Sequence, residues 1–120
     1  MPWEVEYTDE FLEWWNGISG RDQDSVSKSV DRLIEDGISL DFPHSSAIHS
    51  SQHSHMRELR VQGGRSSIRV FYAFDPRRTS ILLIGGAKTD GDRFYRQYVP
   101  IADRLYDRYL EELRQEGLIP

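Results

Sequence analysis

The chain has 120 residues, of which 38% are hydrophobic and 29% are charged, and its formal net charge is −5. This length is typical of one domain, so we expect a single domain over residues 1–120. Cysteine is absent, which excludes disulfides and thiolate metal sites. No apolar run reaches the roughly 20 residues that span a bilayer, and the N-terminus has no signal-peptide core. We therefore expect a cytoplasmic protein without a membrane partner.

The charge is unevenly distributed along the chain. Residues 1–43 carry three basic and eleven acidic side chains, whereas residues 44–98 carry nine basic and four acidic ones. Residues 99–120 carry three basic and five acidic side chains. A basic middle between acidic ends can bind a polyanion locally while the protein stays soluble.

The first 37 residues predict a strand followed by two helices. Residues 3–7 alternate apolar and acidic side chains, which is typical of a strand with one solvated face. Thr8 is a predicted N-cap for the first helix and Ser19 for the second, after a short link over residues 18–21. Gly37 is a predicted C-cap. Residues 41–55 are rich in Ser and His without periodicity, which predicts a loop.

Three strands are predicted in the middle of the chain, over residues 56–61, 67–74 and 80–84. Turn residues separate them at 62–66 and 75–78. The unbroken apolar run 81–84 indicates an interior strand, and the glycine-containing segment 85–88 leaves it.

The last predicted element is a C-terminal helix. Its apolar residues recur at intervals of three and four, and Gly117 ends it. Pro100 suits the first turn of a helix, so we expect the helix to start there and residues 92–98 to form a separate turn or irregular stretch. The fold class is therefore α+β: an N-terminal strand and helix hairpin, then a three-stranded antiparallel meander and a C-terminal helix.

Strand alternation places two arginines together. If Leu59 and Val61 face the core, then Glu58 and Arg60 face away from it, and Arg69 faces the same open side from the next strand. Two registers are possible. In one, Arg60 and Arg69 stand opposite each other, which is unfavourable unless an anion joins them. In the other, Glu58 opposes Arg69 and forms an ordinary ion pair. The sequence leaves both open.

Lys88 and four histidines are further candidates. Lys88 follows the end of a strand, where binding groups are common. The histidines lie in a Ser-rich loop without a metal-binding motif, so neither a metal nor another cofactor is expected; they are His44, His49, His53 and His55. Histidines near the arginines could transfer protons at neutral pH, or could be ordinary loop residues.

The segments 56–60, 68–73 and 81–88 resemble the HigB-like, phage-derived branch of the RelE/ParE toxin superfamily. The resemblance covers nearly the whole chain and implies a RelE/ParE-like fold. It also implies the toxin of a type II toxin-antitoxin pair, which cleaves mRNA on the ribosome. The implied partner is a helix-turn-helix antitoxin encoded in the same operon, which can also bring the toxin into an operator DNA complex.

Carried over by position, the resemblance assigns the family's arginines to Arg57, Arg60 and Arg69 and its lysine to Lys88. The hypothesis is metal-free cleavage, in which a 2′-hydroxyl attacks its own phosphodiester. Arg60 and Arg69 would stabilise the transition state. Lys88, or His53 or His55, would assist proton transfer.

In the site hypothesis the catalytic residues are Arg60, Arg69 and Lys88, and the RNA-binding residues are Arg57, His53 and His55. The first proton acceptor is left open. The alternatives are a ParE-type gyrase poison that cleaves nothing, and a degenerate member that only binds antitoxin and operator.

Overall fold

The computed structural model describes residues 2–62 and 67–120. Within them, five strands form one sheet in the order β1-β5-β4-β3-β2. The elements are β1 (Val5–Tyr7), α1 (Asp9–Gly17), α2 (Gly20–Asp36), the 3-10 turn η1 (Gly37–Ser39), β2 (Ser45–Ala47), β3 (Arg57–Val61), β4 (Ile68–Phe74), β5 (Ser80–Ala87) and α3 (Gly91–Gln115). This arrangement confirms the α+β class, with β3, β4 and β5 as the predicted antiparallel meander.

The predicted caps of the first two helices are confirmed. The Thr8 hydroxyl accepts a hydrogen bond from the Phe11 N–H at 2.9 Å, and the Ser19 hydroxyl accepts one from the Asp22 N–H at 3.1 Å. Each bond satisfies a donor that would otherwise lack a partner at the start of a helix. Gly37 ends α2 with a φ of +56°, a conformation that favours glycine. Only Ile18 and Ser19 separate the two helices, so the link is shorter than expected.

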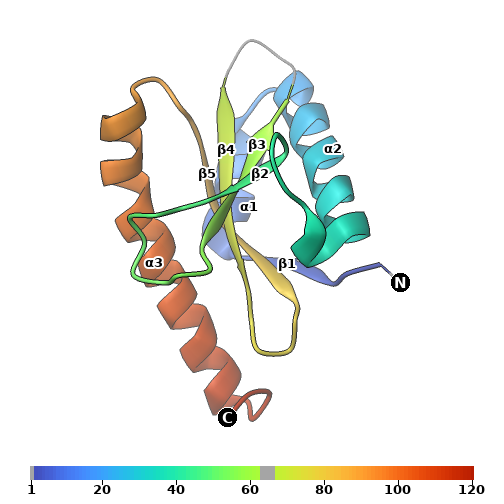
Figure 1. Cartoon of the computed structure of the whole chain (residues 1–120), viewed down its shortest axis with the longest axis vertical. Coiled ribbons are helices and arrows are strands. Elements are labelled where there is room, and N and C mark those ends of the chain that lie inside the picture. Colours follow the sequence, from blue (N-terminus) through green and yellow to red (C-terminus); the bar gives the residue numbers. More distant parts are fainter. Residues whose placement is uncertain (1, 63–66) are drawn as a thin grey trace.

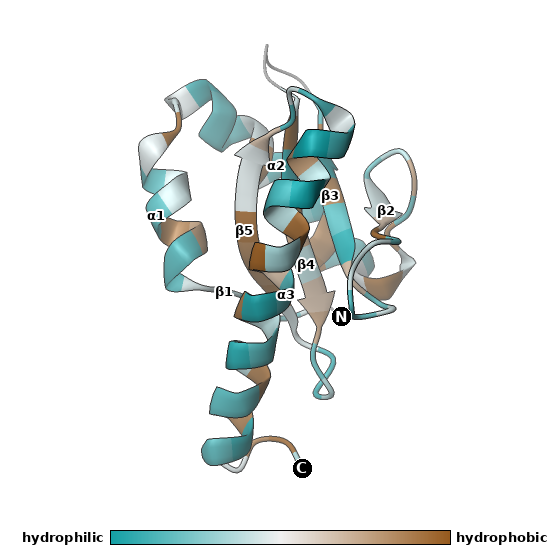
Figure 2. Cartoon of the chain, turned by 90° about the vertical axis from the view of Figure 1, so that its left-hand side faces the viewer, coloured by the Kyte–Doolittle hydropathy of each residue, from teal (hydrophilic) through white to brown (hydrophobic). Residues whose placement is uncertain are grey.

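The helices cover both faces of the sheet (Figure 1). On one face, α1 and α2 pack through Phe11, Val26 and Leu33 against apolar residues of β3, β4 and β5. On the other, α3 packs against Phe71 and Leu83. Hydrophobic residues concentrate in the strands, and the outer sides of the helices are hydrophilic (Figure 2). No helix in the described ranges is long and apolar enough to cross a membrane.

The sheet therefore lacks the open face that strand alternation predicted. Arg69 and Phe71 were expected to point away from the core, but α3 covers that side, and Phe71 is fully buried. The prediction was wrong because the alternation in β4 separates two apolar cores rather than a core from solvent. Only Arg69 interrupts an otherwise apolar strand, which is typical of a strand buried on both faces.

Three boundaries also differ from expectation. The predicted loop 41–55 contains β2, which pairs with β3 and so extends the meander. Residues 85–87 of the predicted exit segment 85–88 instead continue β5 beside β4. Residues 92–98 belong to a continuous α3, with Pro100 inside the helix. Proline removes one backbone hydrogen bond there. The burial of Val99, Ala102 and Leu105 against the sheet offsets that loss.

The two predicted hairpin turns have different outcomes. The turn at 75–78 is confirmed: the Asp75 carboxylate accepts from the backbone N–H groups of Arg77 and Thr79, and Arg78 has a φ of +68°. The turn predicted over residues 62–66 falls mostly at 63–66, outside the described residues.

Candidate functional site

Arg60 and Arg69 stand directly opposite each other in the β3–β4 ladder. The same ladder pairs Leu59 with Val70 and Glu58 with Phe71. Of the two registers that the sequence left open, the structure therefore has the one with opposed arginines. Both arginines lie on the α3 side of the sheet, since Glu58, two residues before Arg60, bonds to a residue of α3.

The ion pair between Glu58 and Arg69, which was expected only in the other register, is nevertheless present. Glu58 lies diagonally across the ladder from Arg69, and the distance from the Arg69 Nε to the Glu58 Oε1 is 3.2 Å, without hydrogen-bond alignment. A second guanidinium nitrogen of Arg69 donates to the Ser67 hydroxyl and to the Ile68 carbonyl. Arg69 is 7% exposed and Glu58 is 4% exposed. Arg69 is thus a buried, partnered cation, not the solvent-facing one that was expected.

Arg60 has a different environment. It is half-buried, and its guanidinium lies 5.1 Å from the centroid of the Phe42 ring. Its Nε is buried and has no hydrogen-bond partner among the described residues. Within those residues no carboxylate comes within ion-pair distance of Arg60, whereas Arg69 has Glu58. Arg60 therefore contributes the unneutralised charge of the opposed pair.

Two more residues complete this end of the sheet. The Tyr95 hydroxyl of α3 lies 2.7 and 2.9 Å from the two carboxylate oxygens of Glu58. Burial, together with this bond to a carboxylate, raises the pKa of Tyr95 to about 12. The Lys88 Nζ lies 5.3 Å from the centroid of the Tyr95 ring. The backbone N–H of Lys88 also donates to the Ser67 carbonyl, next to the strand that carries Arg69.

We call Glu58, Arg60, Arg69, Lys88 and Tyr95 the arginine cluster. The sequence predicted three of its members as catalytic residues, and the structure brings those three together. Glu58 had been considered only as an ion-pair partner. Tyr95 was missed because its segment was expected to lie outside the C-terminal helix. A continuous helical pattern through Phe94, Tyr98 and Ile101 was the signal that could have found it.

Close packing holds α3 over this cluster. Gly86 of β5 lies opposite Arg69, and the ring of Tyr98 packs against it. A Cβ atom on Gly86 would come within 2.7 Å of that ring. Glycine at this position therefore allows α3 to approach the sheet closely enough for the Tyr95 hydroxyl to reach Glu58.

Arg57 does not belong to the arginine cluster. It shares a strand face with Leu59, which packs toward α1 and α2 on the opposite side of the sheet. Its Nε donates to the Ser45 hydroxyl at 3.0 Å, and that hydroxyl is 2.6 Å from the Tyr72 hydroxyl. Arg57 therefore helps to attach β2 to the sheet, and the expectation that it joins the other arginines was wrong.

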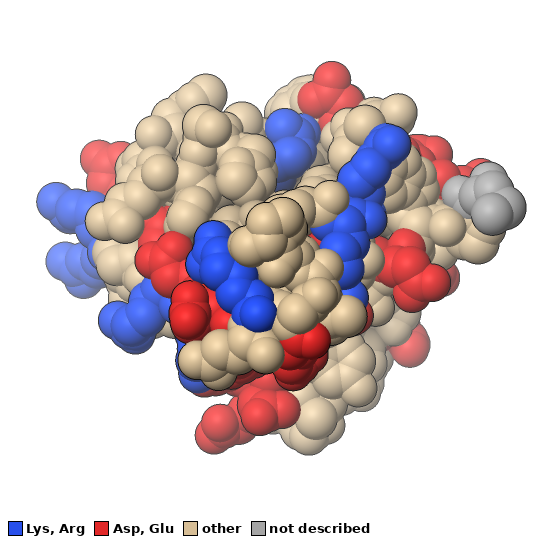
Figure 3. Space-filling view, turned by 90° about the horizontal axis from the view of Figure 1, so that it is seen from below, with Lys and Arg blue, Asp and Glu red and all other residues tan. Residues whose placement is uncertain are grey.

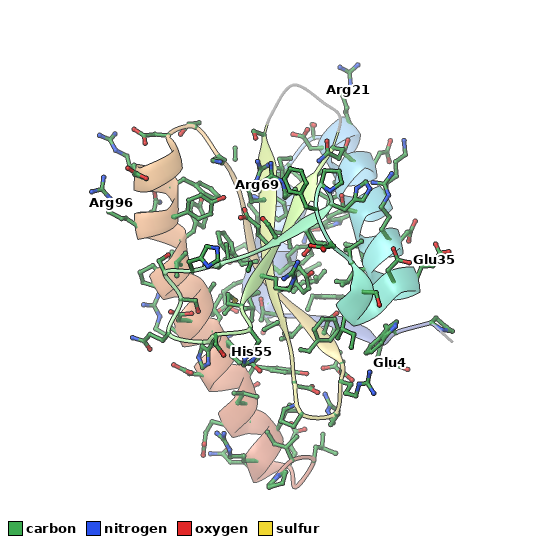
Figure 4. All side chains as sticks on the ribbon, in the orientation of Figure 1. Glu4, Arg21, Glu35, His55, Arg69 and Arg96 are labelled. Atoms are coloured by element: carbon green, nitrogen blue, oxygen red, sulfur yellow. The ribbon has the colours of Figure 1, made fainter. Side chains whose placement is uncertain are left out.

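The loop histidines are also placed elsewhere. The His53 Nε2 is 2.8 Å from the Asp107 Oδ1, and the His55 Nε2 is 2.9 Å from the Tyr106 hydroxyl. Tyr106 follows Tyr95 by eleven residues, about 16 Å along the helix axis. In Figure 4, His55 lies well below Arg69. The structure thus separates both histidines from the arginine cluster, contrary to the hypothesis that they assist proton transfer there.

The chemistry of the histidines agrees with a packing role. Burial, and the neighbouring His53, lower the pKa of His55, which favours its neutral form. Over residues 2–62 and 67–120, no group of three or more His, Asp or Glu side chains has an arrangement that could hold a metal ion.

The C-terminal end of α3 also carries arginines, but carboxylates accompany them. Figure 3 shows acidic and basic side chains interspersed on this face. Arg108 of α3 forms two hydrogen bonds with Glu10, and Arg77, which contacts Tyr109 of α3 from the turn between β4 and β5, lies 2.8 Å from the fully buried Asp75 carboxylate. Paired charges of this kind stabilise contacts between elements and leave little positive potential for a ligand.

The comparisons with known proteins agree on one family of toxins. Residues 13–107 match the family model described as "Phage derived protein Gp49-like". Two similar proteins are candidate toxins of Mycobacterium tuberculosis. HigB2 is 32% identical over 101 residues, and HigB3 is 36% identical over 98 residues. These matches cover 82% and 81% of this chain. The chain spans half of the length of HigB2 and 84% of that of HigB3.

Two solved structures share the fold. One is the RelBE2 toxin-antitoxin complex of M. tuberculosis, with a TM-score of 0.57 at 14% identity; the match covers 73% of this chain and 100% of that one. The other is a mutant of the E. coli toxin RelE in the free state, with a TM-score of 0.60 at 12% identity. That match covers 83% of this chain and 97% of that one.

Proposed function

This chain belongs to the phage-derived Gp49-like family, and from that premise we propose that it is the toxin of a type II toxin-antitoxin pair. The family match confirms the resemblance inferred from the sequence. The activity we propose is metal-free cleavage of mRNA on the ribosome. The observation that carries this proposal is the arginine cluster, where Arg60 opposes Arg69 beside a carboxylate, a phenol and an ammonium group.

The proposed reaction is an internal transfer at an RNA phosphodiester. The ribose 2′-oxygen attacks the adjacent phosphorus, a bond forms between them, and the bond to the 5′-oxygen breaks. The products are a 2′,3′-cyclic phosphate and a 5′-hydroxyl. Negative charge develops on the phosphoryl oxygens in the transition state, and Arg60, whose charge is unneutralised, stabilises it. Arg69 lies 3.2 Å from the Glu58 carboxylate and holds it in place, which makes Arg69 a positioning residue.

Protons are transferred at both ends of the reaction. The 2′-hydroxyl gives its proton to the Tyr95 oxygen as Tyr95 passes its own proton to Glu58, to which it is already bonded. The raised pKa of Tyr95 keeps it protonated at neutral pH, as a relay of this kind requires. Lys88 donates a proton to the departing 5′-oxygen. An arginine is a poor base because its pKa exceeds about 12, which is why we assign this role to Glu58.

The test is induction of the chain in cells, followed by mapping of mRNA 5′ ends. Codon-phased cuts that disappear in Arg60→Ala support the proposal. DNA double-strand breaks with an SOS response, and no mRNA cuts, would support a gyrase poison instead. An expressed, folded chain that causes neither would be a degenerate member that only binds antitoxin and operator.

The proposed partner is a helix-turn-helix antitoxin. A surface suited to it is the groove between α1, α2 and β1, which has a volume of about 330 Å³ and apolar lining residues that include Phe11 and Trp15. Tyr7 and Leu12, which also line it, are 58% and 39% exposed. Acidic residues predominate in this part of the chain, so an apolar segment with basic flanks would fit. Binding there leaves the arginine cluster uncovered.

A further inference from the structure

A second groove lies directly beside the arginine cluster. It has a volume of about 730 Å³, within the range of ligand sites, and runs between α3 and the loop that precedes β3. The loop contributes Ser50 and Gln52. From α3 come residues at helical spacing: Asp92, Tyr95, Arg96, Val99, Pro100, Asp103, Arg104 and Asp107.

Two of the acidic residues in this groove already have partners. The carboxylate of Asp103 accepts hydrogen bonds from the Ser51 hydroxyl and from the Gln52 backbone N–H. The Asp107 carboxylate contacts His53. Both therefore attach the loop to α3 and build the wall of the groove. Asp92 is exposed, near the N-terminal end of α3, where a carboxylate is favourable for the helix.

The basic residues of the groove have no such partners. Arg96 and Arg104 are exposed, and across the described part of the chain neither has a carboxylate within ion-pair distance. They are eight residues apart on α3, about 12 Å along its axis. Arg108 and Arg114, on the next turns, both pair with glutamates. The unpaired arginines of α3 thus include two that line the groove.

Tyr95 connects the groove to the arginine cluster. Its side chain lines the groove, and its hydroxyl contacts Glu58. A strand of RNA whose scissile phosphate lies at Arg60 and Tyr95 would therefore extend into this groove. Two arginines without carboxylate partners beside an aromatic side chain are features of sites for single-stranded nucleic acid.

We propose that this groove binds the single-stranded RNA next to the scissile phosphate, an inference that rests on the proposed nuclease function. Arg96 and Arg104 contact the backbone phosphates. Gln52 and Ser50, exposed on the opposite wall, supply donors and acceptors for a base edge. The groove therefore contributes both affinity and base preference to cleavage.

The test uses a short single-stranded RNA with 2′-O-methyl groups, which cannot be cleaved, and measures its binding by fluorescence anisotropy at several salt concentrations. The variant is the double replacement Arg96→Ala with Arg104→Ala. The matched control is Arg21→Ala with Arg32→Ala, which removes two exposed charges from α2, away from the groove. Figure 4 shows Arg96 at the left of the molecule, on α3, and Arg21 at the top, on α2.

The expected result is that the groove variant binds several-fold more weakly. Its slope of log affinity against log salt should be smaller by about 1.4, the loss of two phosphate contacts to a single strand. The control should match the wild type. A groove variant whose salt slope equals that of the wild type would overturn the inference. In that case the nuclease proposal still stands if Arg60→Ala abolishes cleavage. Absence of salt-dependent RNA binding by the wild type would overturn the groove site, and 5′-end mapping then decides the nuclease proposal separately.

Discussion

Arg60 and Arg69 stand opposite each other across β3 and β4, yet in the described structure only Arg69 has a carboxylate beside it. Two like charges in adjacent strands are unfavourable unless something compensates them. The buried Glu58 carboxylate compensates the charge of Arg69. The charge of Arg60 has no such partner among the described residues. In the reaction proposed above, this asymmetry makes Arg69 a positioning residue and Arg60 the residue that stabilises the transition state, and the first two predictions test it.

We predict that Arg69→Ala destabilises the fold much more than Arg60→Ala does. Removing Arg69 leaves the buried Glu58 carboxylate without its counter-charge, at a cost of about 3–5 kcal/mol in the free energy of unfolding. Removing the half-buried Arg60 should cost less than about 1 kcal/mol. Urea denaturation of both variants checks this. A double-mutant cycle with Glu58→Gln should show strong coupling to Arg69, and equal stabilities of the two alanine variants would contradict the assignment.

We predict that Arg60→Ala abolishes growth arrest while the fold is preserved. Each preorganised donor to a developing anion typically contributes about 10²–10³-fold to the rate. Growth after induction and mRNA 5′-end mapping measure the loss, and circular dichroism confirms folding. Arg21→Ala, an exposed arginine on α2, is the control and should remain toxic. A folded, expressed Arg60→Ala protein that still arrests growth would refute its catalytic role.

We predict that Tyr95 makes the fold sensitive to alkaline pH. Its pKa is raised to about 12 in the folded chain, above the unfolded value near 10. The protonated phenol therefore stabilises the folded state fully below pH 10, and this contribution is lost as the pH rises through 12. In Tyr95→Phe, the free energy of unfolding should decline less steeply over that interval. Indistinguishable slopes in the two proteins would show that Tyr95 is not held by Glu58 in solution.

We predict that activity needs neither a metal nor the loop histidines. Cleavage should survive EDTA, because the arginine cluster contains no set of metal ligands. His49→Ala, His53→Ala and His55→Ala should each retain most of the catalytic rate, since His53 and His55 pack against the C-terminal half of α3. Lys88→Ala is the contrasting variant and should lose activity. Activity that zinc restores after chelation would overturn this prediction.

We predict that the antitoxin binds the groove between α1 and α2. Leu12→Asp places a charge in its apolar lining and should weaken the complex at least about ten-fold. Ile38→Asp changes another exposed hydrophobic residue, 59% exposed, that does not line the groove, and it should bind normally. Titration calorimetry with the protein encoded beside this chain gives both affinities. If Arg60→Ala weakens the complex and Leu12→Asp does not, the antitoxin covers the arginine cluster instead.

The sequence alone determined part of the local structure. Thr8, Ser19 and Gly37 mark helix ends through bonds and backbone angles that depend on near neighbours, so each could be recognised in isolation. The order of three apolar strands and the alternation within them likewise predicted the meander and placed Arg60 and Arg69 on one face. The motifs in those strands also identified the family, because the motifs and their spacing are properties of the chain itself.

Only the tertiary structure decided which charges meet. The strand register joins residues through space, and the sequence allowed both pairings of Arg69. Burial of the second sheet face depends on α3, a helix that continues through Pro100, which local preference argued against. That same helix brings Tyr95 to Glu58. Its residues Tyr106 and Asp107 contact the loop histidines His55 and His53 and hold them away from the arginines. Contacts between distant segments fix these outcomes, because packing energies exceed the small local preferences from which a single sequence is interpreted.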